Sequence, residues 1–174
     1  MLKVSSKFSL IALTLLLSPF AQANNFSYNY FEVRGGFGPQ TIGGEFSMLL
    51  MENAHFVGRV DTSFENDWDA AAGVGFNGPI GSFADIYGQI LIHHVNFVDS
   101  SSSDSAFQPE FNIGGRVWMT NQIELTGRIG LHKERSVFHA GLNFHSTEAL
   151  SLFAGARNDG VYGPQFSIAA RFNY

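Results

Sequence analysis

From residue 28 to the C-terminus, apolar and polar residues alternate in short runs that are separated by turn-forming residues. In the closing stretch Phe166 to Tyr174, apolar side chains occupy every second position, while Ser167, Arg171 and Asn173 lie between them. Successive side chains of a β-strand point to opposite faces, so this period of two predicts strands with one apolar and one polar face. Ten such strands are predicted, over residues 28–37, 44–50, 55–64, 69–76, 84–97, 107–119, 122–132, 137–145, 149–157 and 164–174.

The breaks between these segments carry turn chemistry. Examples are Gly38-Pro39, Asn77-Gly78-Pro79 and the serine tract 100–103. Short strands at regular spacing are typical of a β-sandwich or a β-barrel. No helical period of 3.6 residues is found after residue 23.

Charged residues share one parity of these strands. When the more apolar parity is taken as the outer face, six of the seven arginines after residue 23 fall on the other face, and Arg135 falls in a turn. A sandwich would leave open sheet edges, whereas a closed barrel can turn its apolar face to lipid and its charged face to a lumen. The predicted lumen charge network is Glu32, Arg34, Glu45, Arg59, Asp61, Glu110, Arg116, Glu124, Arg128, Arg157 and Arg171.

The N-terminal 23 residues have the features of a secretory signal peptide. Lys3 and Lys7 precede an apolar run over 8–17, and Ala21-Gln22-Ala23 offers small residues for cleavage. The apolar run is shorter than the roughly 20 residues that a membrane-spanning helix needs. We therefore expect a signal peptide over 1–23, cleaved after Ala23, and one domain over 24–174.

Composition narrows the class further. The chain has no cysteine, so disulfides are excluded, and its 10 basic against 15 acidic residues argue against a nucleic-acid partner. Most predicted strands approach the roughly 9–11 residues of a tilted transmembrane strand. The predicted fold is all-β, a closed antiparallel up-and-down transmembrane β-barrel of about ten strands. Eight strands are the alternative, if 69–76 and 149–157 do not complete the wall.

Five segments carry a resemblance that spans 28–174: NYFEVRGGFG, ENAHFVGRVDTSF, ADIYGQILIHH, TNQIELTGRIGLH and FSIAARFNY. Together they resemble the small outer-membrane β-barrel proteins of Gram-negative bacteria, in the OmpA-like barrel superfamily. The resemblance implies a place in the cell outer membrane, in contact with its lipid and lipopolysaccharide. It also implies that Phe172 and Tyr174 form the terminal signal read by the outer-membrane assembly machinery, although most members end in Phe. We expect a monomer.

Opposite charges on neighbouring strands should pair, so the sequence predicts a plugged or narrow lumen and a structural or surface-interaction role. A narrow porin-like pore for ions or small solutes is the alternative. A lipid-modifying enzyme is less favoured, because the candidate pair His145-Ser146, beside Glu148, is adjacent in sequence and adjacent strand residues point to opposite faces. We expect no catalytic residue, metal or cofactor.

Two further groups lie toward the outer rim. His93 and His94 should diverge, so they cannot chelate one metal together, whereas His132 and His139 share a parity and could meet through a hydrogen bond. The outer loops should present an acidic, serine-rich exterior suited to surface interactions. Its predicted acidic residues are Glu65, Asp67, Asp99, Asp104 and Asp159.

Overall fold

The structure, a computed structural model, describes residues 26–64, 67–96 and 107–174. The predicted signal peptide over 1–23 and the loop positions Glu65, Asp99, Asp104 and 100–103 lie outside these residues. All ten predicted strands are present. They are β1 (Tyr30–Phe37), β2 (Thr41–Met51), β3 (Ala54–Ser63), β4 (Trp68–Pro79), β5 (Ala84–Asn96), β6 (Phe107–Trp118), β7 (Ile123–His132), β8 (Arg135–His145), β9 (Leu150–Asn158) and β10 (Gln165–Asn173).

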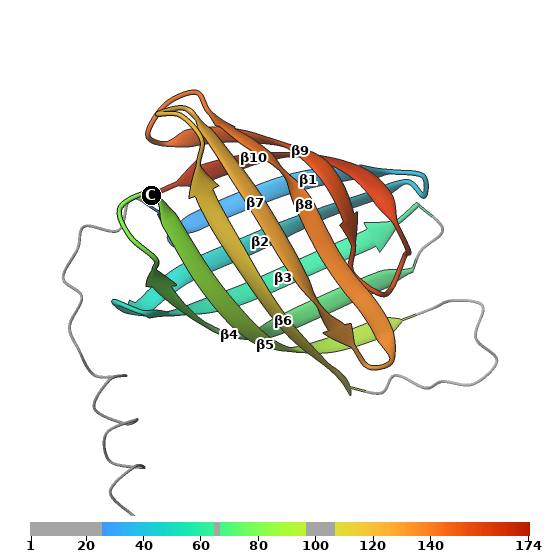
Figure 1. Cartoon of the computed structure of the whole chain (residues 1–174). Coiled ribbons are helices and arrows are strands. Elements are labelled where there is room, and N and C mark those ends of the chain that lie inside the picture. The colour runs from blue at the N-terminus through green and yellow to red at the C-terminus, as the bar shows by residue number, and fades with distance from the viewer. Residues whose placement is uncertain (1–25, 65–66, 97–106) are drawn as a thin grey trace, which may run out of the picture.

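Each strand pairs antiparallel with its neighbours in the chain, and β1 pairs with β10 to close the sheet into a barrel (Figure 1). The closing register runs from Tyr30 opposite Asn173 to Phe37 opposite Phe166. The prediction of a closed, ten-stranded, up-and-down barrel is therefore confirmed. The eight-strand alternative is wrong, because β4 and β9 each pair along both edges. Within the described ranges, no helix has the length and hydropathy needed to cross a membrane.

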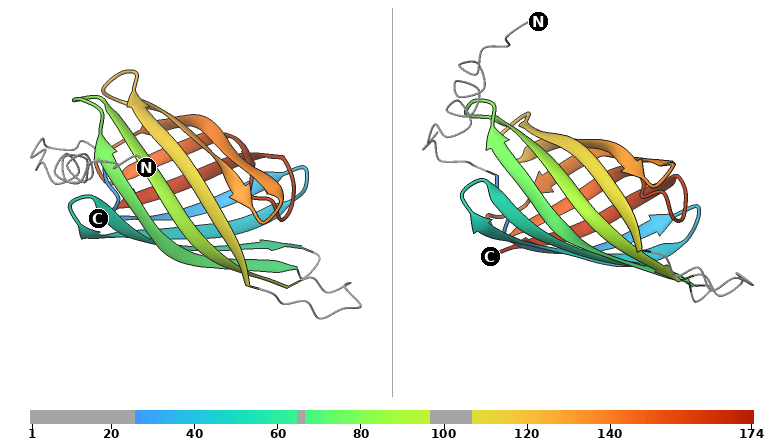
Figure 2. Two further views of the ribbon diagram at one scale, coloured as in Figure 1. Left: turned by 60° about the horizontal axis from the view of Figure 1, so that its bottom comes forward. Right: turned by 90° about the horizontal axis from the view of Figure 1, so that it is seen from below.

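Both ends of the described chain lie at the same end of the barrel, which we call the terminal end (Figure 2). There the Tyr174 backbone N–H donates to the Asn29 carbonyl oxygen at 3.2 Å. The turns at 52–53, 80–83, 119–122 and 146–149 also lie at the terminal end. The connections at 38–40, 133–134 and 159–164 lie at the other end, which we call the loop end.

Two strands extend three residues beyond one of their predicted bounds, because residues predicted to form turns continue the ladder. Strand β2 begins at Thr41, and its paired residues include Gly43 and Gly44. Strand β4 continues through Asn77, Gly78 and Pro79, which lie opposite Tyr87, Ile86 and Asp85. Pro79 is the last residue of its strand, so its missing N–H falls at the end of the ladder.

The two faces of the wall differ completely in chemistry. Every strand exposes large apolar side chains on the outer surface, and the inner face is lined mainly by buried polar and charged side chains. Val57 and Leu91 are fully buried apolar residues among them. One outward residue from each strand in chain order illustrates the outer surface: Phe31, Ile42, Val60, Val74, Ile90, Ile113, Leu125, Leu142, Leu152 and Ile168.

Candidate functional site

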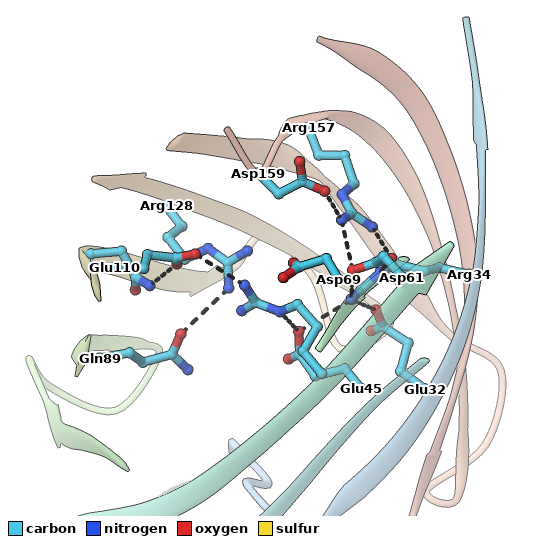
Figure 3. Close-up of polar contacts among 12 residues, drawn as sticks. Glu32, Arg34, Glu45, Asp61, Asp69, Gln89, Glu110, Arg128, Arg157 and Asp159 are labelled. Carbon is cyan, nitrogen blue, oxygen red and sulfur yellow. Dashed lines mark hydrogen bonds and ion pairs between the residues drawn. The ribbon is translucent and has the colours of Figure 1, made fainter. Parts of the chain in front are cut away.

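The lumen is the candidate site, since all eleven charged residues predicted to face it are buried there. Asp61 on β3 accepts four hydrogen bonds from two arginines. Arg34 donates to it from Nε at 3.0 Å and from Nη2 at 2.9 Å (Figure 3). Arg157 donates to the same carboxylate from β9, at 3.1 Å from each terminal nitrogen. Asp61 therefore ties β1, β3 and β9 together across the lumen.

A second carboxylate extends this connection through the centre of the barrel. Glu45 on β2 accepts from Arg34 at 3.1 Å, from Arg59 at 2.9 Å and from the Tyr30 hydroxyl at 2.6 Å. Arg59, only 2% exposed, reaches onward to Glu110 on β6 at 3.4 Å. One guanidinium thus joins opposite sides of the wall.

His93 on β5 continues the chain of contacts. Its Nδ1 lies 2.9 Å from an Asp69 oxygen, and its Nε2 lies 2.8 Å from Glu110. An imidazole that meets a carboxylate at each ring nitrogen is best satisfied as the cation, because only the cation has two N–H donors. We therefore treat His93 as the seventh positive charge of the lumen.

Arg171 on β10 joins this connected set of charges through Glu32. It donates to Glu32 from Nη2 at 2.7 Å and from Nε at 2.9 Å, and Arg34 also approaches Glu32 at 3.4 Å. We call the connected set the main network, and it includes side chains from eight of the ten strands. Its members are Glu32, Arg34, Glu45, Arg59, Asp61, Asp69, His93, Glu110, Arg157, Asp159 and Arg171.

Nearer the terminal end, a separate terminal cluster surrounds Glu124 on β7. Arg116 donates to it from Nε at 2.7 Å and from Nη2 at 2.9 Å. His145 lies 3.0 Å away through Nε2, and the Asn143 amide donates at 3.1 Å. These contacts include β8, so the main network and the terminal cluster together involve all ten strands.

The segment 26–29 was predicted in part to belong to the first strand, but β1 begins at Tyr30 and this segment instead packs inside the terminal end. Phe26 stacks on Trp118 with ring centroids 5.7 Å apart, and the Tyr28 hydroxyl donates to Asp85 at 2.7 Å. The Arg116 guanidinium lies over the Phe26 ring at 4.9 Å, and it donates to the Ser27 carbonyl oxygen at 3.0 Å. The segment therefore occupies the terminal mouth of the lumen.

Glycine makes room for two of the buried polar side chains. A Cβ at Gly43 would lie 2.0 Å from Asp61 Oδ1, and a Cβ at Gly75 would lie 2.3 Å from His55 Nε2. Atoms that close must move. Gly43 on β2 thus leaves room on the inner face for the carboxylate of Asp61, its partner on β3.

The structure does not bring the whole predicted charge set into one network. Eight of the eleven residues belong to the main network, Arg116 and Glu124 form the terminal cluster, and Arg128 stands apart from both. Asp69, Asp85 and Asp159 are buried carboxylates that the prediction missed. Asp69 and Asp85 lie on the inward parity of their strands, so strand parity could have identified them.

Asp159 corrects one expectation about the outer loops. It was predicted to be exposed, but it is 2% exposed and forms a short ion pair with Arg157. Its Oδ1 also accepts from the Val161 backbone N–H at 2.9 Å, which orders the 159–164 connection. In the same connection, burial raises the pKa of Tyr162, whose hydroxyl donates to the Asp61 carbonyl oxygen at 3.2 Å.

The histidines follow the predicted parity, but one predicted contact is wrong. His93 points inward while His94 packs outside between Trp68 and Phe107, with centroid distances of 5.2 and 5.6 Å. His132 stacks on His93 at 4.1 Å rather than meeting His139. His139 lies opposite Arg128, four residues further along β7 from His132, and packs on Phe153 at 4.5 Å.

Little open space remains at the centre of the lumen. A polar cavity of about 30 Å³ lies between the main network and the terminal cluster, with Glu45, Arg116, Arg128 and Arg171 among its lining. A wider cleft of about 800 Å³ opens at the terminal end, and Arg116, Trp118 and His145 are among its lining residues. Among the described residues, no group of three or more His, Cys, Asp or Glu side chains is placed to hold a metal ion.

The chain is similar to several solved structures. The KdgM porin in complex with disordered oligogalacturonate matches with a TM-score of 0.56 and 6% identity, covering 83% of this chain and 99% of that one. The KdgM porin alone gives 0.55 and 7%, with the same coverage. The N-terminal β-barrel domain of Pseudomonas aeruginosa OprF covers 84% of this chain and 98% of its own at 14% identity, with a TM-score of 0.39.

At such identities the KdgM match shows the fold alone, that of an outer-membrane β-barrel. No family model matches the sequence, and no curated protein matches it. Membership of the OmpA-like superfamily in particular stays a prediction.

Proposed function

We propose that this chain is an integral outer-membrane β-barrel whose lumen is closed by its own side chains, and that its role is structural or surface-interactive. The membrane assignment is supported by the outer surface, where apolar residues such as Ile90 and Ile113 are about half exposed. Soluble monomers rarely expose contiguous apolar patches beyond a few hundred Å². The terminal end is then periplasmic and the loop end external. Outer-membrane lipid and lipopolysaccharide surround the barrel wall. The protein is a monomer.

The packed lumen is the observation that carries the proposed role. Arg59 and Arg157 cross it with ion pairs, and the central cavity of about 30 Å³ has room for about two water-sized particles at most. A hydrated solute has no continuous path through such an interior. Removing one partner of a buried ion pair costs about 3–5 kcal/mol, so the network resists opening.

Conductance in planar lipid bilayers tests this role. The refolded full-length mature chain should give no stable channel events, after its fold has been checked by heat-modifiable migration in gels. The double variant Arg34→Ala and Arg59→Ala empties the centre and should give small, measurable currents, which establishes that the assay can detect a channel of this size. Steady currents from the wild-type barrel would overturn the closed-lumen proposal.

A narrow pore is the second candidate. It is favoured by the terminal-end cleft of about 800 Å³, which has the inward-facing Arg116 in its lining. The KdgM matches are named as porins, which makes ion passage the natural alternative to test. The same bilayer recordings decide between the two candidates.

We also propose that the protein is not an enzyme. The candidate base His145 directs Nε2 to Glu124 and packs its ring on Trp118 at 4.4 Å. These contacts give His145 a structural partner on each side, with Ser146 following in the turn. Incubation of the folded protein with outer-membrane phospholipid and lipopolysaccharide should leave both unmodified by mass spectrometry, and release or transfer of an acyl chain would contradict the proposal.

A further inference from the structure

Arg128 differs from every other arginine of the lumen. Each of the other five forms an ion pair with a buried carboxylate, whereas the hydrogen bond of Arg128 goes to the neutral amide oxygen of Gln89, at 3.4 Å. Its Nε is buried and has no hydrogen-bond partner among the described residues. The side chain belongs to a residue only 9% exposed. A buried guanidinium in this position calls for an acceptor that the chain itself does not provide.

Arg128 faces the polar cavity of about 30 Å³, and two more arginines, Arg116 and Arg171, line the same space. A cavity needs at least about 10–15 Å³ on this measure to hold a water-sized particle. The space therefore admits a small particle, such as a halide ion or a water molecule, and is too small for a polyatomic anion such as sulfate.

Three arginines and two carboxylates line the cavity. Arg116 is matched by Glu124 and Arg171 by Glu32. Glu45, the other carboxylate of the lining, already accepts from two arginines of the main network. Among the described residues, Arg128 is thus the cation of the lining that no carboxylate meets by direct contact, and a small anion in the cavity would supply that contact.

We propose that Arg128 holds a small monovalent anion, chloride under ordinary conditions, at the centre of the barrel. A guanidinium offers only donors, and an anion accepts hydrogen bonds from all sides without presenting a hydrogen atom in return. The neighbouring Arg116 lines both this cavity and the terminal-end cleft, so its movement is the route by which the ion enters. The inference depends on the lumen alone and holds whichever of the two proposed roles is correct.

Bromide tests the site directly, because it replaces chloride and scatters anomalously. Crystals of the full mature chain soaked in sodium bromide should show an anomalous peak in contact with the Arg128 guanidinium. The variant Arg128→Met should lose that peak, and Arg135→Gln, which removes an exposed arginine at the start of β8, should keep it. Water in the cavity and no anomalous signal at saturating bromide would overturn the proposal.

A solution measurement covers the case in which crystals fail. The midpoint of thermal unfolding in detergent is followed as chloride replaces gluconate at constant ionic strength. The wild-type and Arg135→Gln proteins should become more stable as chloride rises, and Arg128→Met should lose most of that response. Arg128→Met should fold, because no carboxylate loses an ion-pair partner in that variant. An equal chloride response in wild type and Arg128→Met would contradict the site.

Discussion

Arg34 and Asp61 meet in a two-point ion pair inside the barrel, with nitrogen–oxygen distances of 3.0 and 2.9 Å. Arg157 shares the same carboxylate from the far side of the lumen. Parallel contacts of this kind combine charge with fixed geometry, and few other pairings hold two distant strands so directly. Asp61 is therefore the residue on which the packing of the loop-end half of the lumen depends most.

Asp61→Asn should lower the free energy of unfolding by about 3–5 kcal/mol, because two buried guanidinium groups lose their shared negative partner. Urea-induced unfolding in detergent micelles measures the change. Glu52→Gln, an exposed carboxylate in the β2–β3 turn, is the matched control and should stay within about 0.5 kcal/mol of wild type. Equal stability of the two variants would mean that the Asp61 pairs contribute nothing net.

Gly43→Ala tests whether the small residue on β2 makes room for that carboxylate. The new Cβ would lie 2.0 Å from Asp61 Oδ1, so the carboxylate or the strand must move, and we expect a loss of about 1–3 kcal/mol in unfolding free energy. Gly35→Ala on β1 meets nothing within 4 Å and should have the opposite sign, since alanine is favoured over glycine in a strand by about 0.5–1 kcal/mol. Two changes of the same sign would refute the space argument.

The packed segment 26–29 can be followed through Trp118. Phe26→Ala removes the ring stacked on that indole and opens the terminal mouth to water. In a background with Trp68→Phe, which leaves Trp118 as the only tryptophan, the emission maximum should move to longer wavelength. Phe111→Ala, on the outer surface, should leave it in place. An unchanged spectrum for Phe26→Ala would show that the segment leaves the mouth in solution.

The predicted assembly signal at Phe172 and Tyr174 calls for separate measurements in cells and in vitro. Replacing both residues with serine should reduce the amount of folded barrel in cells several-fold. The purified variant should still refold in detergent, because the lost contacts are peripheral, including a Phe46–Tyr174 stack at 6.1 Å. Tyr174→Phe keeps the aromatic end and should assemble normally. Failure of the serine variant to refold in vitro would assign the defect to stability instead.

Strand parity predicted which charged residues face the lumen, because a charged side chain on the lipid face has a large free-energy cost. An arginine on the lipid face at the midplane would cost about 2–4 kcal/mol, so inward placement of residues such as Arg59 and Arg128 is strongly encoded in the sequence. The same parity contained Asp69 and Asp85, which are readable once β4 and β5 are assigned. The number of strands followed from the regular spacing of turns.

The partners of these charges could not be predicted in the same way. Asp61 meets Arg157 across the lumen, and such contacts depend on barrel stagger and side-chain reach, which no single strand specifies. Asp159 lies in a connection, where parity has no meaning. The packing of Phe26 and Tyr28 could not be predicted either. Both residues continue the apolar and polar alternation of β1, and this alternation does not distinguish a strand from a segment that turns into the terminal mouth of the lumen.

The ion pair between Asp61 and Arg157 fixes the circumference of the wall as well as its stability. Barrel diameter grows with the number of strands, so an inserted hairpin would lengthen the span that the ion pair between β3 and β9 has to cross. A wider barrel derived from this protein would therefore need new ion-pair partners in its lumen as soon as the hairpin was added. The charges that fill this barrel therefore also limit how it can be enlarged, by engineering or by gene duplication.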